Sequence, residues 1–219
     1  ELYSMKILLV MSMLTMLGGA AYGQFLLASD APLLVPAKID LSDDESWSGI
    51  QKRSDSEFFL TNPEKHPQIF CLAKNIYFEA GIDNKAGMYA VADVTLNRVN
   101  DLRWAHTVCG VVYEGHMRES WKTKQDPSLP KELREFYPIL HKCQFSWYCD
   151  GKPDTIPYGS DNWVRSQEVA WDIYVNATMR GITDGAVHYH ATYVKPNWRT
   201  DRGMHSVGRI GAHIFYRRD

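Results

Sequence analysis

Apolar residues recur at a helical period in two consecutive segments of the chain. From residue 68, apolar side chains return every three or four positions up to Ala80, the period of a helix with one buried face. Gly81 follows at a position suited to end this helix. A segment with the same period runs from about Lys85 to Val99. The pattern therefore predicts two adjacent amphipathic helices.

The pattern changes from helical to β-rich in the C-terminal part. An apolar stripe predicts a third helix over 163–180, capped by residue 161 or 162 and followed by Gly181. Short β-rich pieces then occupy 186–194 and 210–216, with a glycine-containing loop between them. We expect an α+β fold that is mostly helical with a small antiparallel sheet.

The N-terminal residues are patterned differently from the rest. Lys6 precedes an apolar run over 7–17 and a small-residue stretch over 18–23, the layout of a secretory signal peptide. We expect 1–27 to be a signal peptide or, alternatively, an uncleaved anchor that associates with a membrane through 7–27. A buried core helix is a third interpretation.

Residues 28–66 are rich in proline, serine and acids and lack sustained periodicity, which predicts an acidic flexible arm before a folded body at 67–219. Residues 1–64 carry 4 basic and 9 acidic side chains, and 65–219 carry 20 and 17. The net charge of −2 over the whole chain lacks the general electrostatic pattern of a nucleic-acid binder. A mildly basic body suits a polyanionic partner such as a cell-wall polymer.

Four cysteines, Cys71, Cys109, Cys143 and Cys149, allow three pairings if all are bridged. Disulfides are expected in an exported chain, and Cys143 with Cys149 would close a short loop. Four buried thiols in a reducing compartment are the alternative.

Glu79 is the first candidate for chemistry. It falls three residues after Ile76, which places its carboxyl on the apolar face near the C-terminal end of the predicted helix. Burial and the negative end of the helix dipole both disfavour the ionised form. A carboxylic acid that is still protonated near neutral pH serves a glycosidase as its general acid. In the alternative, Glu79 turns outward or pairs with Lys74 or Arg98.

Another candidate site is the aromatic segment 143–151. Flat apolar rings occur there together with groups that form directional hydrogen bonds, which suits a groove for sugars because a pyranose has an apolar face and polar edges. An aromatic core loop is the alternative. The side chains expected to hold sugars are Gln144, Phe145, Ser146, Trp147 and Tyr148.

His188, Tyr189 and His190 are expected to form the opposite wall of such a groove. In a strand, His188 and His190 face the same side, and with Cys143 or Cys149 they would offer ligands to zinc. A metal-dependent wall amidase is therefore the alternative from another chemical class. The sequence lacks H-E-x-x-H and C-x-x-C spacing, so we assign no metal and no cofactor. Motifs for nucleotide binding and for a G-x-S-x-G nucleophile are also absent.

A series of motifs occurs in one order along residues 68–216. The motifs are residues 71–80, 90–92, 96–99, 107–113, 143–151, 185–191, 194–198 and 210–216. In this combination the chain resembles the cell wall hydrolase family typified by the spore-cortex-lytic enzyme SleB. Similar domains occur widely in bacteria and their phages.

The resemblance implies a lysozyme-like, lytic-transglycosylase-related fold and makes 67–219 the catalytic domain. It implies that peptidoglycan glycan strands are the substrate and places the catalytic acid on Glu79. It also implies export to the periplasm or cell envelope, or a role as a phage-particle component or lysis protein. One departure is that Gly81 and Ile82 stand where the family usually has Arg and Gly. The loss of that basic side chain is expected to change either how Glu79 is tuned or how the substrate is held.

The expected reaction is cleavage of the β-1,4 bond between MurNAc and GlcNAc by lytic transglycosylation, which forms 1,6-anhydro-MurNAc ends. An ordinary glycosidase needs a second carboxylate, and the sequence singles out none among Asp83, Asp93 and Asp150. The alternatives are a hydrolytic muramidase or glucosaminidase, the zinc-dependent wall amidase, and an inert wall-binding or virion structural component.

Overall fold

The computed structural model describes residues 50–53, 57–60, 64–157 and 159–219, all of which belong to the unit Val35–Asp219. The predicted signal peptide or anchor at 1–27 lies outside the described residues. No helix among the described residues is long and apolar enough to span a membrane.

The segment predicted as a flexible arm contains regular structure where it is described. Strand β1 (Ile50–Arg53) pairs antiparallel with β2 (Glu57–Leu60). A hairpin therefore stands just before the helical part of the chain, in a segment where the sequence pattern predicts none.

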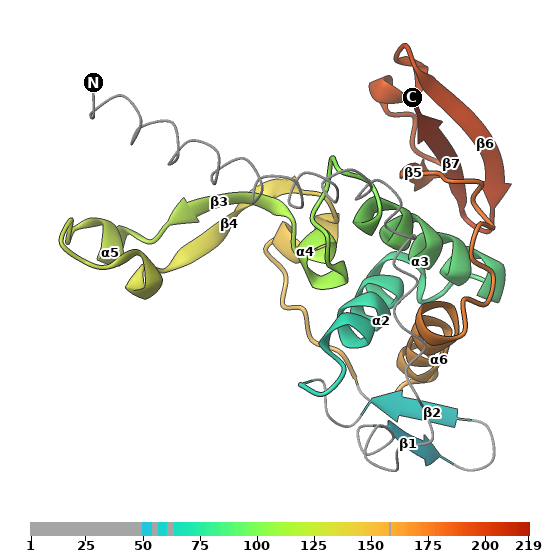
Figure 1. Ribbon diagram of the computed structural model, residues 1–219, viewed down its shortest axis with the longest axis horizontal. Helices are drawn as coiled ribbons and strands as arrows, with labels where there is room; N and C mark the ends of the chain where they lie inside the picture. The colour runs from blue at the N-terminus through green and yellow to red at the C-terminus, as the bar shows by residue number, and fades with distance from the viewer. Residues whose placement is uncertain (1–49, 54–56, 61–63, 158) are drawn as a thin grey trace, which may run out of the picture. The chain divides into compact units, whose positions relative to one another are not determined.

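Helices α2 (Pro67–Ala80), α3 (Lys85–Val99) and α6 (Asp161–Val175) pack together in the described part of the chain (Figure 1). Asn84 caps α3, because its side chain accepts a hydrogen bond from the amide of Gly87 at 2.9 Å. The apolar face predicted for α2 is confirmed, whereas α3 was wrongly predicted as amphipathic, because it is buried on all sides from Gly87 to Leu96 and its Ala90 and Val94 pack against Ala186 and Phe215. The side chains buried between the three helices include Ile69, Leu72, Ile76, Met88, Val91, Ala92, Trp163, Ala170 and Ile173.

Helix α6 ends at Val175, well before its predicted end at Arg180, so this boundary was wrong. The reason is Asp93, a fully buried carboxylate on α3. It accepts hydrogen bonds from the backbone amides of Gly181 and Thr183 and from the Thr183 hydroxyl, and it pairs with Arg180. A continuing helix would not present these two amides to one carboxylate, so tertiary contacts override the apolar period.

Strands β5 (His188–Ala191), β6 (Met204–Ile210) and β7 (His213–Arg218) form an antiparallel sheet with the order β5-β7-β6. The predicted small antiparallel sheet, and with it the α+β class, is confirmed. However, β6 occupies part of the predicted loop. Its pairing shifts register between Ser206 and Gly208, where Gly208 has φ +131°, so a bulge hides the strand from the sequence pattern.

Asp83 joins the turn between β6 and β7 to the connection between α2 and α3. Its Oδ2 accepts a hydrogen bond from the Ala212 amide at 2.8 Å. A Cβ at Gly87 or Gly211 would lie 2.2 or 2.4 Å from this same oxygen, so a larger residue at either position would push the Asp83 carboxylate out of place. The β-rich piece predicted over 210–216 therefore corresponds to the end of β6 at Ile210, this anchored turn and most of β7.

An arm between α4 (Val108–Val112) and the 3₁₀ helix η3 (Ser146–Cys149) was not predicted. Strand β3 (Gly115–Glu119) pairs antiparallel with β4 (Phe136–Cys143), and Figure 1 shows the pair reaching away from α2, α3 and α6. Most side chains of this β3–β4 arm are exposed. Two short helices, α5 (Trp121–Lys124) and η2 (Lys131–Leu133), form its far end.

All four cysteines lie among the described residues and form two disulfides, so the alternative of four buried thiols was wrong. Cys71–Cys109 joins α2 to α4 across 38 residues, and Cys143–Cys149 closes a loop of 6 residues between β4 and η3. Disulfides of this kind are typical of exported proteins.

Replacing both Cys71 and Cys109 with alanine is expected to cost more stability than replacing Cys143 and Cys149. The chain-entropy model gives about 4 kcal/mol for a closed loop of 38 residues and about 2 kcal/mol for one of 6. Urea unfolding followed by tryptophan fluorescence would measure both losses. Equal losses, or a larger loss from the short loop, would contradict the expectation.

Candidate active site

A cleft of about 580 Å³ lies among α2, α3, the η3 segment and the C-terminal sheet. Tyr148 and His188, which were predicted to take part in the site, do not line it. The predicted residues that the cleft brings together are Glu79, Gln144, Phe145, Ser146, Trp147, Tyr189 and His190.

Glu79 is half-buried on the wall of this cleft, in the last turn of α2. Its Oε2 accepts a hydrogen bond from the Tyr189 hydroxyl at 3.0 Å. Lys74 pairs instead with Asp154 at 3.7 Å, so the alternative in which Glu79 turns outward or pairs with Lys74 was wrong. Burial raises the pKa of Glu79, while the Tyr189 hydrogen bond and the charge of Arg98 act in the opposite direction and are weaker.

Tyr189 reaches Glu79 because residues alternate across strand β5. His188 and His190 point to one side of the strand, where both contact the ring of Trp198, and Tyr189 points to the other. Burial and the neighbouring charge of Glu79 raise the pKa of Tyr189 well above its usual value. The side chain therefore stays a neutral phenol at neutral pH and can donate a hydrogen bond to the carboxylate.

Arg98 is a cleft residue that the sequence analysis considered only as a partner for Glu79. Its side chain is 6% exposed, and its Nε donates to the backbone carbonyl of Val187 at 2.8 Å. The guanidinium lies 5.1 Å from the ring centre of Phe145, and its Nη1 is buried without a hydrogen-bond partner among the described residues. The sequence signal for this residue was its place on the apolar face of α3, one turn after Thr95.

His213 also lines the cleft and was missed. Its ring meets that of Tyr189 edge to face at 5.1 Å, and its Nδ1 lies 3.6 Å from Asp83 Oδ2. Burial lowers the pKa of His213, and Asp83 partly opposes this shift. The imidazole is therefore neutral near pH 7 and packs behind the phenol that holds Glu79.

Trp147 anchors the aromatic segment to the helices. Its Nε1 donates to Asn75 Oδ1 at 3.0 Å, and the Asn75 amide in turn donates to Thr95 Oγ1 at 3.2 Å. The Trp147 ring stacks on Phe78 with 4.6 Å between ring centres and is 6% exposed. This ring therefore forms the rigid base of the cleft, and little of it is open to a ligand.

The other residues of the segment divide by exposure. Phe145 is 2% exposed beneath Arg98, and Tyr148 packs edge-on against Tyr113 at 4.9 Å. Gln144 and Ser146 are exposed and line the cleft. The polar groups of the segment, more than its rings, face the space in which a ligand would lie.

The zinc interpretation fails in this structure. Cys143 and Cys149 are bonded to each other, so neither has a thiolate to offer. His190 Nε2 lies 3.1 Å from the Tyr216 hydroxyl, which occupies that ring nitrogen. Within the described ranges, no three His, Cys, Asp or Glu side chains gather as a metal site would require.

Comparison with known proteins gives two solved structures and one family model. The catalytic domain of the Bacillus cereus SleB protein matches with a TM-score of 0.45 and 22% identity, covering 69% of this chain and 91% of that chain. The catalytic domain of the germination-specific lytic transglycosylase SleB from Bacillus anthracis matches with a TM-score of 0.45 and 21% identity, covering 68% and 93%. No curated protein matches the chain.

The family model, described as Cell Wall Hydrolase, matches residues 83–216 and begins just after Glu79. The matched stretch contains Arg98, the aromatic segment, Tyr189 and His213. Since it covers more than half of the chain, the protein belongs to the cell wall hydrolase family and is an enzyme of peptidoglycan degradation.

Proposed function

We propose that this enzyme cleaves the β-1,4 bond between MurNAc and GlcNAc as a lytic transglycosylase, with Glu79 as its catalytic residue. The observation that supports the proposal is the half-buried carboxyl of Glu79 on the cleft wall, with its raised pKa and its hydrogen bond from Tyr189. Such a carboxyl keeps its proton closer to neutral pH than an exposed one and can deliver it in a fixed direction.

In the proposed reaction, protonated Glu79 gives its proton to the glycosidic oxygen while the bond from that oxygen to C1 of the muramic acid breaks. Positive charge develops at C1 and its ring oxygen. The 6-hydroxyl of the same sugar then bonds to C1, and its proton returns to Glu79. The product is a 1,6-anhydro ring, and the enzyme ends in its starting protonation state.

The other carboxylates weighed from the sequence have different surroundings. The Asp93 carboxylate is buried and accepts hydrogen bonds from the chain around Thr183. The Asp83 carboxylate accepts a hydrogen bond from the Ala212 amide. Asp150 and Asp154 do line the cleft, each with a lysine Nζ at 3.7 Å. A hydrolytic mechanism would depend on one of these two, whereas transglycosylation requires neither.

The place of action follows from the substrate and the disulfides. Two disulfides fit a protein that works in an oxidising compartment, and glycan strands lie outside the cytoplasm. We therefore infer export to the periplasm or cell envelope, or action as part of a phage particle. Membrane association through 7–27 stays a prediction from the sequence, because those residues lie outside the described chain.

The variant Glu79→Gln is expected to fold normally and to lose about 10²- to 10⁴-fold in rate, because the amide has the shape of the acid but no proton to give. Release of soluble fragments from purified peptidoglycan measures the rate, and mass spectrometry identifies 1,6-anhydro ends, one water lighter than reducing ends. Glu132→Gln, on the β3–β4 arm, is the matched control. Near-normal activity of the Glu79 variant would refute the assignment.

Asp150→Asn and Asp154→Asn are expected to keep the rate within about tenfold and still produce 1,6-anhydro ends, because the proposed mechanism uses one carboxylate. The same fragment analysis checks both variants. Reducing ends from the unmodified enzyme, together with a large loss of rate in either variant, would instead establish hydrolysis with two carboxylates.

Tyr189→Phe is expected to move the alkaline limb of the pH dependence of kcat/KM to higher pH. The phenol stabilises ionised Glu79, so its removal raises the pKa of Glu79 further and the protonated acid persists to higher pH. The rate at the optimum should fall because the carboxyl loses its fixed orientation. Tyr137→Phe, on the exposed arm, should leave the profile in place. A limb that stays or moves to lower pH would contradict this role.

A further inference from the structure

Another hollow, of about 530 Å³, opens where the β3–β4 arm meets the helices. Its lining is Glu114, Gly115, His116, Lys142, Cys143 and Gln144. Gln144 also lines the cleft that contains Glu79, so the two spaces are neighbours.

The floor of this hollow is held in place by short-range contacts. The Gln144 amide donates to the carbonyl of Glu114 at 3.0 Å, and Cys143 is bridged to Cys149. A Cβ at Gly115 would lie 2.8 Å from Cys143 Sγ, so glycine is needed for the strand to pass the disulfide. The charged side chains around the hollow therefore project from a rigid base.

Glu114 carries an unused acceptor. Its Oε2 is buried and has no hydrogen-bond partner among the described residues. Leaving a buried carboxylate oxygen unpaired is costly, and a donor that entered the hollow would remove that cost. Lys142, on the facing strand, is exposed and forms no ion pair with a described carboxylate. The hollow thus offers a carboxylate oxygen without a hydrogen-bond partner, which the charge of buried Arg98 helps to keep ionised, and an exposed ammonium group on the facing strand.

The lining of the hollow does not suit a sugar ring. It contains no Trp, Tyr or Phe among its described residues, whereas the neighbouring cleft is lined by Phe78, Phe145, Trp147, Tyr189 and Tyr193. A pyranose ring would find no apolar face to lie against. A ligand with separate ammonium and carboxylate groups matches the free charges better.

We propose that this hollow binds the peptide stem of the muramic acid, with Glu114 accepting from an ammonium group and Lys142 pairing with a carboxylate. The stem peptides of peptidoglycan are attached to the lactyl group of the muramic acid, the sugar whose C1 reacts. When that sugar lies in the cleft, its stem peptide can extend into the neighbouring hollow. This inference rests on the proposed function and names its substrate more closely, as glycan strands that carry peptides.

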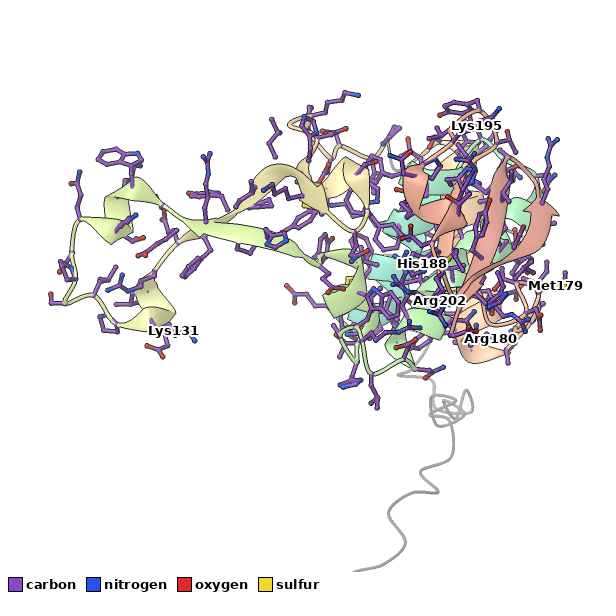
Figure 2. The ribbon with its side chains drawn as sticks, turned by 90° about the horizontal axis from the view of Figure 1, so that it is seen from above. Lys131, Met179, Arg180, His188, Lys195 and Arg202 are labelled. Carbon is purple, nitrogen blue, oxygen red and sulfur yellow. A yellow bond between two sulfur atoms is a disulfide. The ribbon has the colours of Figure 1, made fainter. Side chains whose placement is uncertain are left out.

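The test compares kcat/KM on glycan strands that carry stem peptides with kcat/KM on the same strands after an amidase has removed the peptides. The unmodified enzyme is expected to prefer the peptide-bearing strands. Glu114→Gln and Lys142→Glu should each lower this preference about tenfold, the size expected for losing one charge-assisted contact. Lys131→Glu, at the far end of the arm in Figure 2, and Glu132→Gln, in the same short helix η2, should keep it.

If Glu114→Gln or Lys142→Glu does not fold, a direct binding measurement still tests the proposal. A muramyl tripeptide that ends in a diamino acid should shift the NMR signals of Gly115 and His116 in the Glu79→Gln protein. No such shifts, or equal rates of the unmodified enzyme on both kinds of strand, would overturn the inference and leave the proposed function standing. Failure to cleave either kind of strand would overturn the proposed function itself.

Discussion

The buried guanidinium of Arg98 is the constraint on which the arrangement of the site depends. A cation taken out of water is costly unless it is bonded or paired, and the bond that Arg98 Nε makes, unlike its unpartnered Nη1, reaches a part of the chain that is distant in sequence. Its Nε holds the carbonyl of Val187, the residue before β5, and its plane lies near the ring of Phe145. Helix α3, the aromatic segment and the C-terminal sheet therefore keep one relative placement, and Tyr189 is carried to Glu79 as a result.

The same cation sets the electrostatic balance of the cleft. Burial pushes the pKa of Glu79 up, and the charge of Arg98 holds part of that rise back. A group that must first give a proton and then take one back works best with a pKa near the working pH, so neither effect should dominate completely. Gly81 occupies the position where the family resemblance predicts an arginine. Arg98, on another helix, is the arginine that acts on Glu79 among the described residues.

The sequence predicted the parts of the site that depend on local pattern. Glu79 was found because its helix has a clear apolar period and because the residue sits at that helix's end. The end of α6 was missed because Asp93, on a different helix, draws the following amides to itself. The β3–β4 arm was missed because exposed residues line both faces of its strands, which leaves no alternation of apolar and polar positions to recognise.

His213 was missed for a different reason. Its role depends on the turn at Ala212 being fastened to Asp83, which is 129 residues away, and no spacing rule connects the two positions. For the aromatic segment, the sequence predicted more than the structure shows. Its composition indicated a sugar-binding surface, but the rings of Phe145 and Trp147 are buried and anchor the segment.

That use of the rings has a consequence for substrate binding. Trp147 and Phe145 are almost completely covered, whereas Gln144 and Ser146 are exposed and Tyr193 is 87% exposed at the edge of the cleft. Buried rings make a base that does not move, and exposed polar side chains can adjust to the hydroxyl and acetamido groups of each sugar. Under the proposed function, the base and Glu79 would orient the bond to be cleaved, and groups at the rim would supply affinity. Because Gln144 belongs to both the cleft and the charged hollow, a ligand that spans the two must pass over it. Recognition of the sugar and recognition of what the sugar carries would thus meet at one exposed side chain beside the Cys143–Cys149 disulfide.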